Sequence, residues 1–525
     1  MLIFIKISLI STGDNIYTHG IRSISSYLKN HGHYTRLIFP ITYDNKYSKR
    51  VLHDIKNIVK ESNLIGVTCT SYTSDKSIQL INYLKQLKIP IIWGGIHATF
   101  NPEECIKYTD FVCIGEGEEA MLELADRLSK KQNTTKIRNL WVKENSRVYK
   151  NDVRPLVQDL DKLPHADYDF ANQWILDSGK FVNISEKHFG GCESNQYAHY
   201  RFCKFLPEFK FSRLLLVHTV RGCLHQCTFC CNYNLRKLYH NKGTYIRKRS
   251  IKNVIEELLE LKQKFPSIDL IWFTDDSFFI RSEKELEEFS REYKKKIDLP
   301  FMCYVDPLTF NETKLKLLLD VGLIRIDIGI QTGSEKINKY IYNRFLTNEC
   351  LISVAKVINK YKHKMAPPEY QIIIANPYEI EQDVLATINL LQNLPKPYHL
   401  QPFGLVFFPG TQLFYKAIND GIIKSQKDSC YSVHYTNYVE NFMIKSKKLN
   451  TLYLNLILAL MGGRVTISRY GWLHRYLFKL LINKSVTHFF NKFEFIIKFL
   501  LNIYSLISLQ KRHYNTMIKK VERSN

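Results

Sequence analysis

Short apolar runs alternate with helical patterns along most of this chain, and this alternation limits the possible folds more than any other feature. Strands are predicted at LIFIKISLI (2–10), TRLIFP (35–40), LIGVTCT (64–70), IPIIWGG (89–95) and FVCIGEG (111–117). Between these runs, apolar residues recur at helical spacing, for example in residues 20–32 and 75–88. Strands separated by helices form parallel sheets, so the first third predicts a doubly wound, flavodoxin-like or Rossmann-like α/β domain.

Ligands of such sheets bind beyond the carboxyl ends of the strands. The loops at those ends are STGDN (11–15), TSYTSD (70–75), GGIHAT (94–99) and GEGEE (115–119). Their glycines allow the backbone to approach a bulky ligand closely. We therefore expect a binding site along this edge of the sheet.

Three cysteines follow the apolar run LLLVHTV (214–220) in a C-x3-C-x2-C spacing: Cys223, Cys227 and Cys230. Thiolates are soft ligands that suit iron–sulfur clusters and zinc. A structural zinc ion needs a fourth ligand, which Cys231 or His225 could provide. A four-iron cluster on three cysteines would instead leave one iron open to a substrate or cofactor. The residues alone leave both alternatives open.

Beyond the cysteines the alternation of strands and helices resumes. Residues 251–265 predict an amphipathic helix, with Val254, Leu258 and Leu261 on one face. Strands are predicted at DLIWFTDD (269–276), PFMCYVD (300–306), IRIDIGIQTGSE (324–335), YQIIIANPY (370–378) and HLQPFGLVFFPGT (399–411). Together with the run before the cysteines they make six strand–helix units. In parallel barrels the functional residues lie at the carboxyl ends of strands, where these motifs fall.

The cysteine spacing, with Phe229 just before the third cysteine, resembles the signature of the radical S-adenosylmethionine (radical SAM) enzymes. The resemblance implies a partial (β/α)6 barrel over residues 213–425 and a four-iron four-sulfur (4Fe-4S) cluster on the three cysteines. It also implies that the open iron binds S-adenosylmethionine, which is cleaved to a 5′-deoxyadenosyl radical. An electron donor such as flavodoxin or ferredoxin would reduce the cluster.

The same resemblance assigns further contacts with S-adenosylmethionine. An acidic strand end would meet its amino group, GIQTGSE resembles the family's GIESGS and would contact its ribose, and an arginine would pair with its carboxylate. The implied residues are Phe229, Asp275, Asp276, Gln331, Gly333, Ser334 and Arg344. The acidic pair could instead cap a helix, and the arginine could form a surface salt bridge.

Residues 1–135 resemble the cobalamin-binding domain fused upstream of many radical SAM enzymes, at YLKNHGH (27–33), GGIHATFNPEE (94–104) and GEGEEAMLEL (115–124). The implied cobalamin contacts are Thr12, Gly13, Ser71, Gly94, Gly95, His97, Gly115, Glu116 and Gly117. The DxHxxG motif that supplies a cobalt-ligating histidine is absent, as is usual in this fused family. His97 is expected to order its loop or contact the corrin. A flavodoxin-like domain without a cofactor is the alternative.

The remaining segments carry fewer signals. Residues 136–212 predict a linker hairpin and an irregular connector, with prolines that disfavour a continuing helix. Residues 426–525 predict a mainly helical region, and from residue 430 onward 15 lysines and arginines face three glutamates, half of the net charge of +24. Such a region could bind an anionic membrane or an acidic substrate, or reflect the composition of the chain. Helices that cover the barrel are the favoured interpretation, and no nucleic-acid partner is expected.

The resemblance as a whole implies a cobalamin-dependent radical SAM enzyme, most often a methyltransferase that acts on an unactivated carbon of a small-molecule, peptide or lipid substrate. A radical cyclisation or rearrangement without methyl transfer is the alternative within the class. A cysteine-knuckle RNA-binding protein is the alternative from another class. The start of the chain carries Lys6 within its apolar run and no small-residue cleavage site, so we expect a cytoplasmic protein with reduced thiols.

Overall fold

The computed structural model describes residues 4–42, 44–189 and 213–428. The chain divides into two compact units, which we describe separately: the first unit comprises residues 1–324 and 407–432, the second residues 325–406 and 433–525. The predictions for the basic tail fall beyond residue 428 and so outside the described residues. Within the described ranges, no helix is long and apolar enough to cross a membrane.

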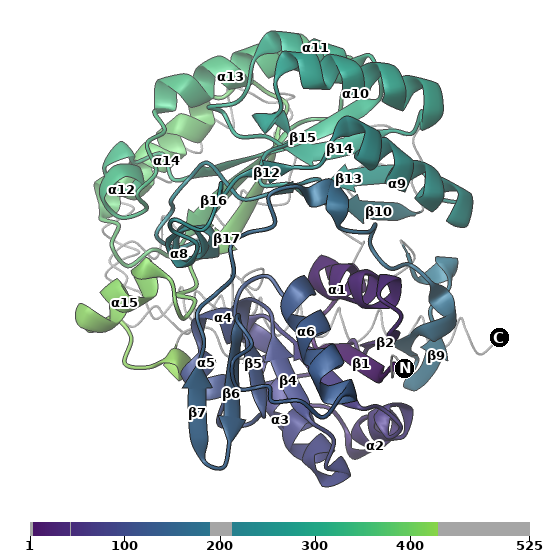
Figure 1. The fold of residues 1–525 in the computed structure, drawn as a ribbon. Coiled ribbons are helices and arrows are strands. Elements are labelled where there is room, and N and C mark those ends of the chain that lie inside the picture. Colours follow the sequence, from purple (N-terminus) through teal and green to yellow (C-terminus); the bar gives the residue numbers. More distant parts are fainter. Residues whose placement is uncertain (1–3, 43, 190–212, 429–525) are drawn as a thin grey trace, which may run out of the picture. The chain divides into compact units, whose positions relative to one another are not determined.

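A parallel sheet forms the centre of the N-terminal part of the first unit (Figure 1). Its parallel core follows the order β5-β4-β3-β1-β2: β1 (Lys6–Ser11), β2 (Tyr34–Phe39), β3 (Leu64–Thr68), β4 (Ile91–Gly94) and β5 (Phe111–Cys113). The connecting helices are α1 (His19–Asn30), α2 (Lys49–Val59), α3 (Ser74–Leu84), α4 (Ile96–Phe100), α5 (Pro102–Cys105) and α6 (Glu118–Ser129). Helix α1 packs against α6, and α2 against α3. The five predicted strands and the doubly wound class are confirmed.

Two hairpins extend this sheet at its edges. The strands β6 (Leu140–Glu144) and β7 (Arg147–Lys150) join beside β5, and β8 (Gln173–Asp177) and β9 (Lys180–Asn183) join beside β2. The sheet thus has nine strands and continues past residue 135 into the predicted linker. The hairpin of β8 and β9 carried no sequence signal, because short edge strands lack a long apolar run.

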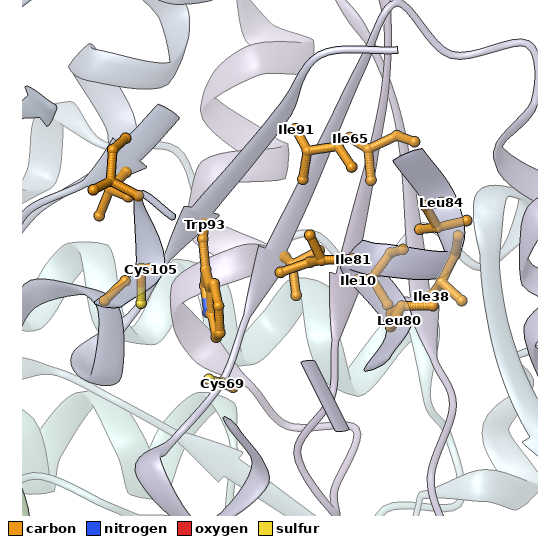
Figure 2. Packing of buried hydrophobic residues seen from close by; sticks show 14 of the residues in the cluster. Ile10, Ile38, Ile65, Cys69, Leu80, Ile81, Leu84, Ile91, Trp93 and Cys105 are labelled. Carbon is orange, nitrogen blue, oxygen red and sulfur yellow. The ribbon is translucent and has the colours of Figure 1, made fainter. Parts of the chain in front are cut away.

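One face of the sheet is buried under α2 and α3. Figure 2 shows Leu80, Ile81 and Leu84 of α3 beside the strand residues of this cluster. Ser48 caps helix α2: its hydroxyl accepts a hydrogen bond from the amide of Val51, which satisfies a donor at the helix end. Trp93 of β4 is fully buried in this cluster. The same cluster includes Leu156 and Tyr239, which follow the first five strands in the sequence, so the core extends beyond those strands.

The first unit also contains three strands of a second sheet. The strands β10 (Leu214–Val217), β13 (Leu270–Phe273) and β14 (Phe301–Tyr304) pair in parallel in this order. A short antiparallel pair, β11 (Val220–Arg221) and β12 (Arg247–Lys248), lies beside the cysteines. The helices are α8 (Cys231–Leu238), α9 (Ile251–Lys264), α10 (Glu283–Lys296), α11 (Glu312–Leu319) and α15 (Gln412–Asn419). Helix α9 coincides with the amphipathic pattern and is capped by Ser250.

The second unit contains the next three strands, β15 (Leu323–Gln331), β16 (Glu369–Ile374) and β17 (His399–Gly404), also parallel and in chain order. Helices α12 (Glu335–Tyr340), α13 (Asn348–Lys360) and α14 (Glu381–Asn393) connect them. The six predicted strands, each separated by helices, are therefore all present.

Candidate functional site: the cysteine loop and the strand ends around it

The cysteine loop, residues 222–230, connects β11 to α8, and α8 begins at Cys231. The amide of Cys230 donates to the carbonyl of Cys227 at 3.0 Å, which closes a turn between two of the predicted ligands. Gly222 opens the loop with a φ of +102°, and a Cβ there would lie 2.6 Å from the carbonyl oxygen of Tyr245. Only glycine fits this position, because both the backbone conformation and the close approach exclude a side chain.

Asp275 anchors the start of this segment from the end of β13. Its carboxylate accepts hydrogen bonds from the amides of Thr219 and Val220 at 2.5 and 2.8 Å, and from the hydroxyl of Thr219 at 2.5 Å. Arg281 donates to the same hydroxyl at 2.9 Å, and Asp275 is fully buried. The carboxylate therefore joins the ends of β10 and β13 and holds the backbone that leads into the cysteines.

Asp276, the second member of the acidic pair, has different surroundings. It is exposed, and its carboxylate accepts a hydrogen bond from the side-chain amide of Asn232 at 3.1 Å. The same amide nitrogen lies 3.7 Å from Sγ of Cys230, and the hydroxyl of Tyr245 donates to the Asn232 carbonyl. The structure thus places Asp276 beside the cysteine loop, where a carboxylate can meet an ammonium group.

The donor set fits an iron–sulfur cluster better than a single zinc ion. No three histidine, cysteine or acidic side chains of the described residues converge on a point that could hold one metal ion. Of the two alternative fourth ligands, His225 pairs with Asp306, whereas the thiol of Cys231 is hydrogen-bonded to that of Cys230. In a four-iron cluster each cysteine binds a different iron, so thiols spaced around a loop suit it.

The loops at the carboxyl edge of the N-terminal sheet also come together. Nδ1 of His97 lies 3.1 Å from the hydroxyl of Ser71, and His97 is buried, which lowers its pKa to about 4. The hydroxyl of Thr12 lies 2.7 Å from that of Ser77 at the start of α3. These contacts join the loops after β1, β3 and β4, and His97 has the geometry of a loop-ordering residue. The predicted contacts Gly13, Gly94 and Gly95 lie in or beside the same loops, and their lack of side chains fits a cobalamin-binding edge, where the backbone must approach a bulky ring system.

The loop after β5, residues 115–119, forms ion pairs that the sequence did not predict. The carboxylate of Glu116 pairs with Arg247 of β12 at 2.6 and 3.1 Å and with Arg221 of β11 at 3.2 Å. Tyr239, at the end of α8, accepts a hydrogen bond from the Glu116 amide at 2.7 Å. The Glu116 carboxylate of this loop therefore binds arginines of the protein, while Gly115 packs closely against Tyr239 and Gly117 against Ile24.

Two predicted residues in the second unit converge on one point. Gln331 ends β15 at a β-bulge with a φ of +72°. A Cβ placed on Gly329 would lie 2.4 Å from Nε2 of Gln331 and 3.6 Å from Nη1 of Arg344, so both side chains extend over this glycine. Arg344 is 5% exposed, and the surface salt bridge considered as the alternative is therefore excluded.

The turn after Gln331 is held by contacts with α12 and α14. Ser334 caps α12 by accepting from the amide of Ile337, and its hydroxyl donates to Asp383 of α14 at 2.6 Å. A Cβ on Gly333 would lie 2.6 Å from Cα of Thr387, so the turn packs directly on α14. Gly333 and Ser334 thus shape the strand end that presents Gln331.

Several residues of the site were missed by the sequence analysis. They are Arg221, Asn232, Arg236, Tyr239, Tyr245 and Arg247, which all contact the cysteine loop, its flanking backbone or the Glu116 loop. The only signal available was position, because Arg221 precedes the first cysteine by two residues and the others lie within the next 26.

Comparisons with known proteins agree with this geometry. Residues 5–125 match the model of the B12 binding domain, and residues 217–391 match the radical SAM superfamily. An uncharacterized methyltransferase of Pyrococcus horikoshii is 28% identical over 379 residues, 70% of this chain and 73% of that protein. The bacteriochlorophyllide d C-8(2)-methyltransferase of Chlorobaculum tepidum is 21% identical, covering 90% of this chain and 89% of its own length.

Two solved structures share the fold. The cobalamin-dependent S-adenosylmethionine radical enzyme OxsB has a TM-score of 0.64 at 13% identity, over 96% of this chain and 76% of that one. The radical S-adenosylmethionine methyltransferase TsrM of Kitasatospora setae, solved with cobalamin and a 4Fe-4S cluster, has a TM-score of 0.60 at 16% identity, over 79% and 78%. With both domains matched and the cysteine loop in place, this chain combines a B12-binding domain with a radical SAM domain, and these two domains imply cobalamin, a 4Fe-4S cluster and S-adenosylmethionine as its cofactors.

Proposed function

We propose that this protein is a cobalamin-dependent methyltransferase that adds a methyl group to an unactivated carbon of a small-molecule, peptide or lipid substrate. The observation that carries the proposal is the direct bonding, within one unit, of the cysteine loop segment to a carboxyl-edge loop of the B12-binding domain. Two cofactor sites tied together in this way suit a reaction that uses both. The relatives named methyltransferases support the same reaction class.

When bound, the three cofactors supply the one-electron and methyl-transfer chemistry that amino-acid side chains cannot provide. The chain itself holds and orients them. Cys223, Cys227 and Cys230 would ligate the cluster, and Asp275 fixes the backbone that presents them. Asp276 would accept a hydrogen bond from the amino group of S-adenosylmethionine.

We also expect Gln331 and Arg344, in the second unit, to bind S-adenosylmethionine. The amide of Gln331 can bond ribose hydroxyls, and the guanidinium of Arg344 can pair with a carboxylate in two parallel hydrogen bonds. Both side chains extend over Gly329. Side chains held in one place by packing lose less conformational entropy when they bind a ligand.

The test is a product analysis with the full chain. The protein is reconstituted anaerobically with iron, sulfide and cobalamin, reduced, and supplied with S-adenosylmethionine that carries a deuterated methyl group, together with a metabolite extract. Methyl transfer predicts both S-adenosylhomocysteine and 5′-deoxyadenosine, and a product that carries the heavy methyl group.

The alternatives give other patterns. If cobalamin is bound and 5′-deoxyadenosine forms without S-adenosylhomocysteine, the result would support a radical cyclisation or rearrangement. Tight zinc with no visible-region cluster absorption would contradict the enzyme class and favour the cysteine-knuckle alternative. Cys227→Ala is the control, and it should abolish 5′-deoxyadenosine formation. A cytoplasmic location, an external flavodoxin or ferredoxin and membrane contact through the tail stay predictions.

A further inference from the structure

We infer that Glu116, Glu118, Arg221 and Arg247 form an ionic clamp that positions the cysteine loop relative to the B12-binding domain. These are positioning residues, since they act through the backbone that carries the iron ligands. The inference goes beyond methyl transfer as such, because it concerns how the cluster loop is placed. It rests on the proposed function only in assuming that both cofactors work together.

The contacts of the clamp are close and specific. Arg247 binds both carboxylate oxygens of Glu116, at 2.6 and 3.1 Å, in the bidentate geometry that favours arginine over lysine. Arg221 bridges the two acids, with Nη1 3.2 Å from Glu116 and Nη2 2.6 Å from Glu118. The hydroxyl of Ser23 on α1 donates to the same Glu118 oxygen at 2.8 Å.

The clamp is largely removed from water. The side chains of Arg247 and Glu118 are 4% and 6% exposed. Burial alone would raise the pKa of Glu118, but Arg221 more than offsets it and lowers that pKa to about 2. A charge that is buried and paired in this way becomes costly to hold once its partner is removed, so the contacts enforce one arrangement.

The clamp holds the cysteine segment on both sides. Before the loop, Arg221 and Arg247 are register partners in the β11–β12 pair, and Arg221 lies two residues ahead of Cys223. After the loop, α8 starts at Cys231 and ends beside Tyr239, whose hydroxyl accepts from the amide of Glu116. The same loop of the B12-binding domain therefore fixes the chain as it enters and leaves the cysteines.

Gly115 shows that this loop is shaped for the contact. Its φ is +75°, and a Cβ there would lie 1.9 Å from the hydroxyl of Tyr239. The glycine that suggested a close approach to a ligand is needed for a close approach to α8. Such close packing is expected of a contact that positions the loop. An incidental surface ion pair lacks it and contributes little to stability.

The test uses hydrogen–deuterium exchange on the full-length protein, followed in peptides covering residues 222–239. Glu116→Gln removes the charge with little change of shape, and Arg247→Lys keeps the charge but loses the bidentate geometry. The matched control is Glu123→Gln, whose carboxylate pairs with Arg154 and Arg127 and, within the described residues, forms no ion pair with the cysteine segment. We expect about tenfold faster exchange in residues 222–239 for Glu116→Gln, and no change there for Glu123→Gln.

A spectroscopic readout separates positioning from general stability. In protein loaded with both cofactors, pulsed dipolar spectroscopy between reduced cluster and cob(II)alamin reports their relative placement. We expect the distribution of distances between the cluster and cobalt to be broader in Glu116→Gln and Arg247→Lys than in wild type, while iron and cobalamin contents are retained. Wild-type exchange in residues 222–239 together with a wild-type distribution in either variant would overturn the inference. Neither measurement depends on methyl transfer, so a failure of the proposed reaction would be recognised separately.

Discussion

Two adjacent aspartates show how neighbouring side chains can carry different tasks. Asp275 is fully buried and accepts three hydrogen bonds from the backbone and hydroxyl groups that lead into the cysteine loop. Asp276 is exposed and meets Asn232 beside Cys230. The sequence assigned both to one cofactor contact, because residue type and position after a strand do not distinguish a buried carboxylate from an exposed one.

Substitution of the two aspartates should therefore give different defects. Asp275→Asn removes a charged acceptor of several hydrogen bonds, so we expect a loss of roughly 1.5–3 kcal/mol in stability and reduced iron incorporation. Asp276→Asn should keep the stability and the iron incorporation of the wild type but weaken the binding of S-adenosylmethionine. This binding is measured by the change that S-adenosylmethionine causes in the EPR spectrum of the reduced cluster. Unchanged cofactor affinity in Asp276→Asn would contradict the role given to this residue.

Gly222 permits a second test at this scale. Gly222→Ala places a methyl group against the backbone of Tyr245 in a conformation that disfavours alanine, so thermal stability and iron content should both fall. Gly20→Ala is the matched control, because a Cβ there meets nothing within 4 Å and lies in helix α1. There we expect a gain of about 0.5–1 kcal/mol. Equal effects in the two variants would show that backbone contacts at Gly222 do not matter.

At the scale of elements, the strand ends of the second unit form one hydrogen-bonded assembly. Thr332, directly after β15, donates to Glu379 ahead of α14 at 2.9 Å and lies 3.0 Å from the hydroxyl of Thr387. Glu379 is buried, and this desolvation raises its pKa to about 8, while the Thr332 hydrogen bond opposes the shift and Asp383 adds to it. Near neutral pH the native state therefore holds this carboxyl largely protonated.

The raised pKa of Glu379 predicts a pH dependence of stability. The native state binds a proton that the unfolded chain has released above pH 4.5, so this contribution is full below pH 4.5 and is lost as the pH rises through about 8. Glu379→Gln should abolish this loss of stability with rising pH. The free energy of unfolding of the variant, relative to that of wild type, should therefore increase by up to about 1.4 kcal/mol per pH unit between pH 4.5 and about pH 8. Thermal melts between pH 5 and pH 9, with Glu381→Gln as control, check the prediction; parallel curves for Glu379→Gln and wild type would contradict it.

The elements differ in how far the sequence could reveal them. The eleven strands predicted from apolar runs are present, since a strand buried on both faces must be apolar along its length. The hairpin of β8 and β9 was not predicted, because an edge strand is partly exposed and its partner β2 lies far away in the sequence. The pairing of Glu116 with Arg247 spans 131 residues, and no local pattern contains such information.

For the whole molecule, the N-terminal sheet and the segments after it share one core. Val153, Leu156 and Tyr239 pack into the cluster built around Trp93, and the hairpins of β6–β7 and β8–β9 cover both edges of the parallel core. The sequence suggested a boundary at residue 135, where the resemblance to the cobalamin-binding domain ends and the predicted linker begins. A linker pattern does not show which later residues return to the same core.

This shared core predicts how fragments behave. A fragment of residues 1–135 leaves strand edges uncovered and part of its core unfilled, so we expect aggregation and no cooperative thermal transition. A fragment of residues 1–189 retains both edge hairpins and should unfold cooperatively, although below the melting temperature of the full chain. Circular dichroism and limited proteolysis distinguish the two. A cooperative transition in the shorter fragment would show that the hairpins are dispensable.

The contact between Tyr239 and the Glu116 loop has a consequence for maturation of the protein. Helix α8 begins directly after the cysteine loop and ends against the B12-binding domain, so ordering of either end favours ordering of the other. By thermodynamic linkage, each cofactor must then strengthen the binding of the other by the same factor. A cell that starves this protein of iron would thereby also lower its hold on vitamin B12.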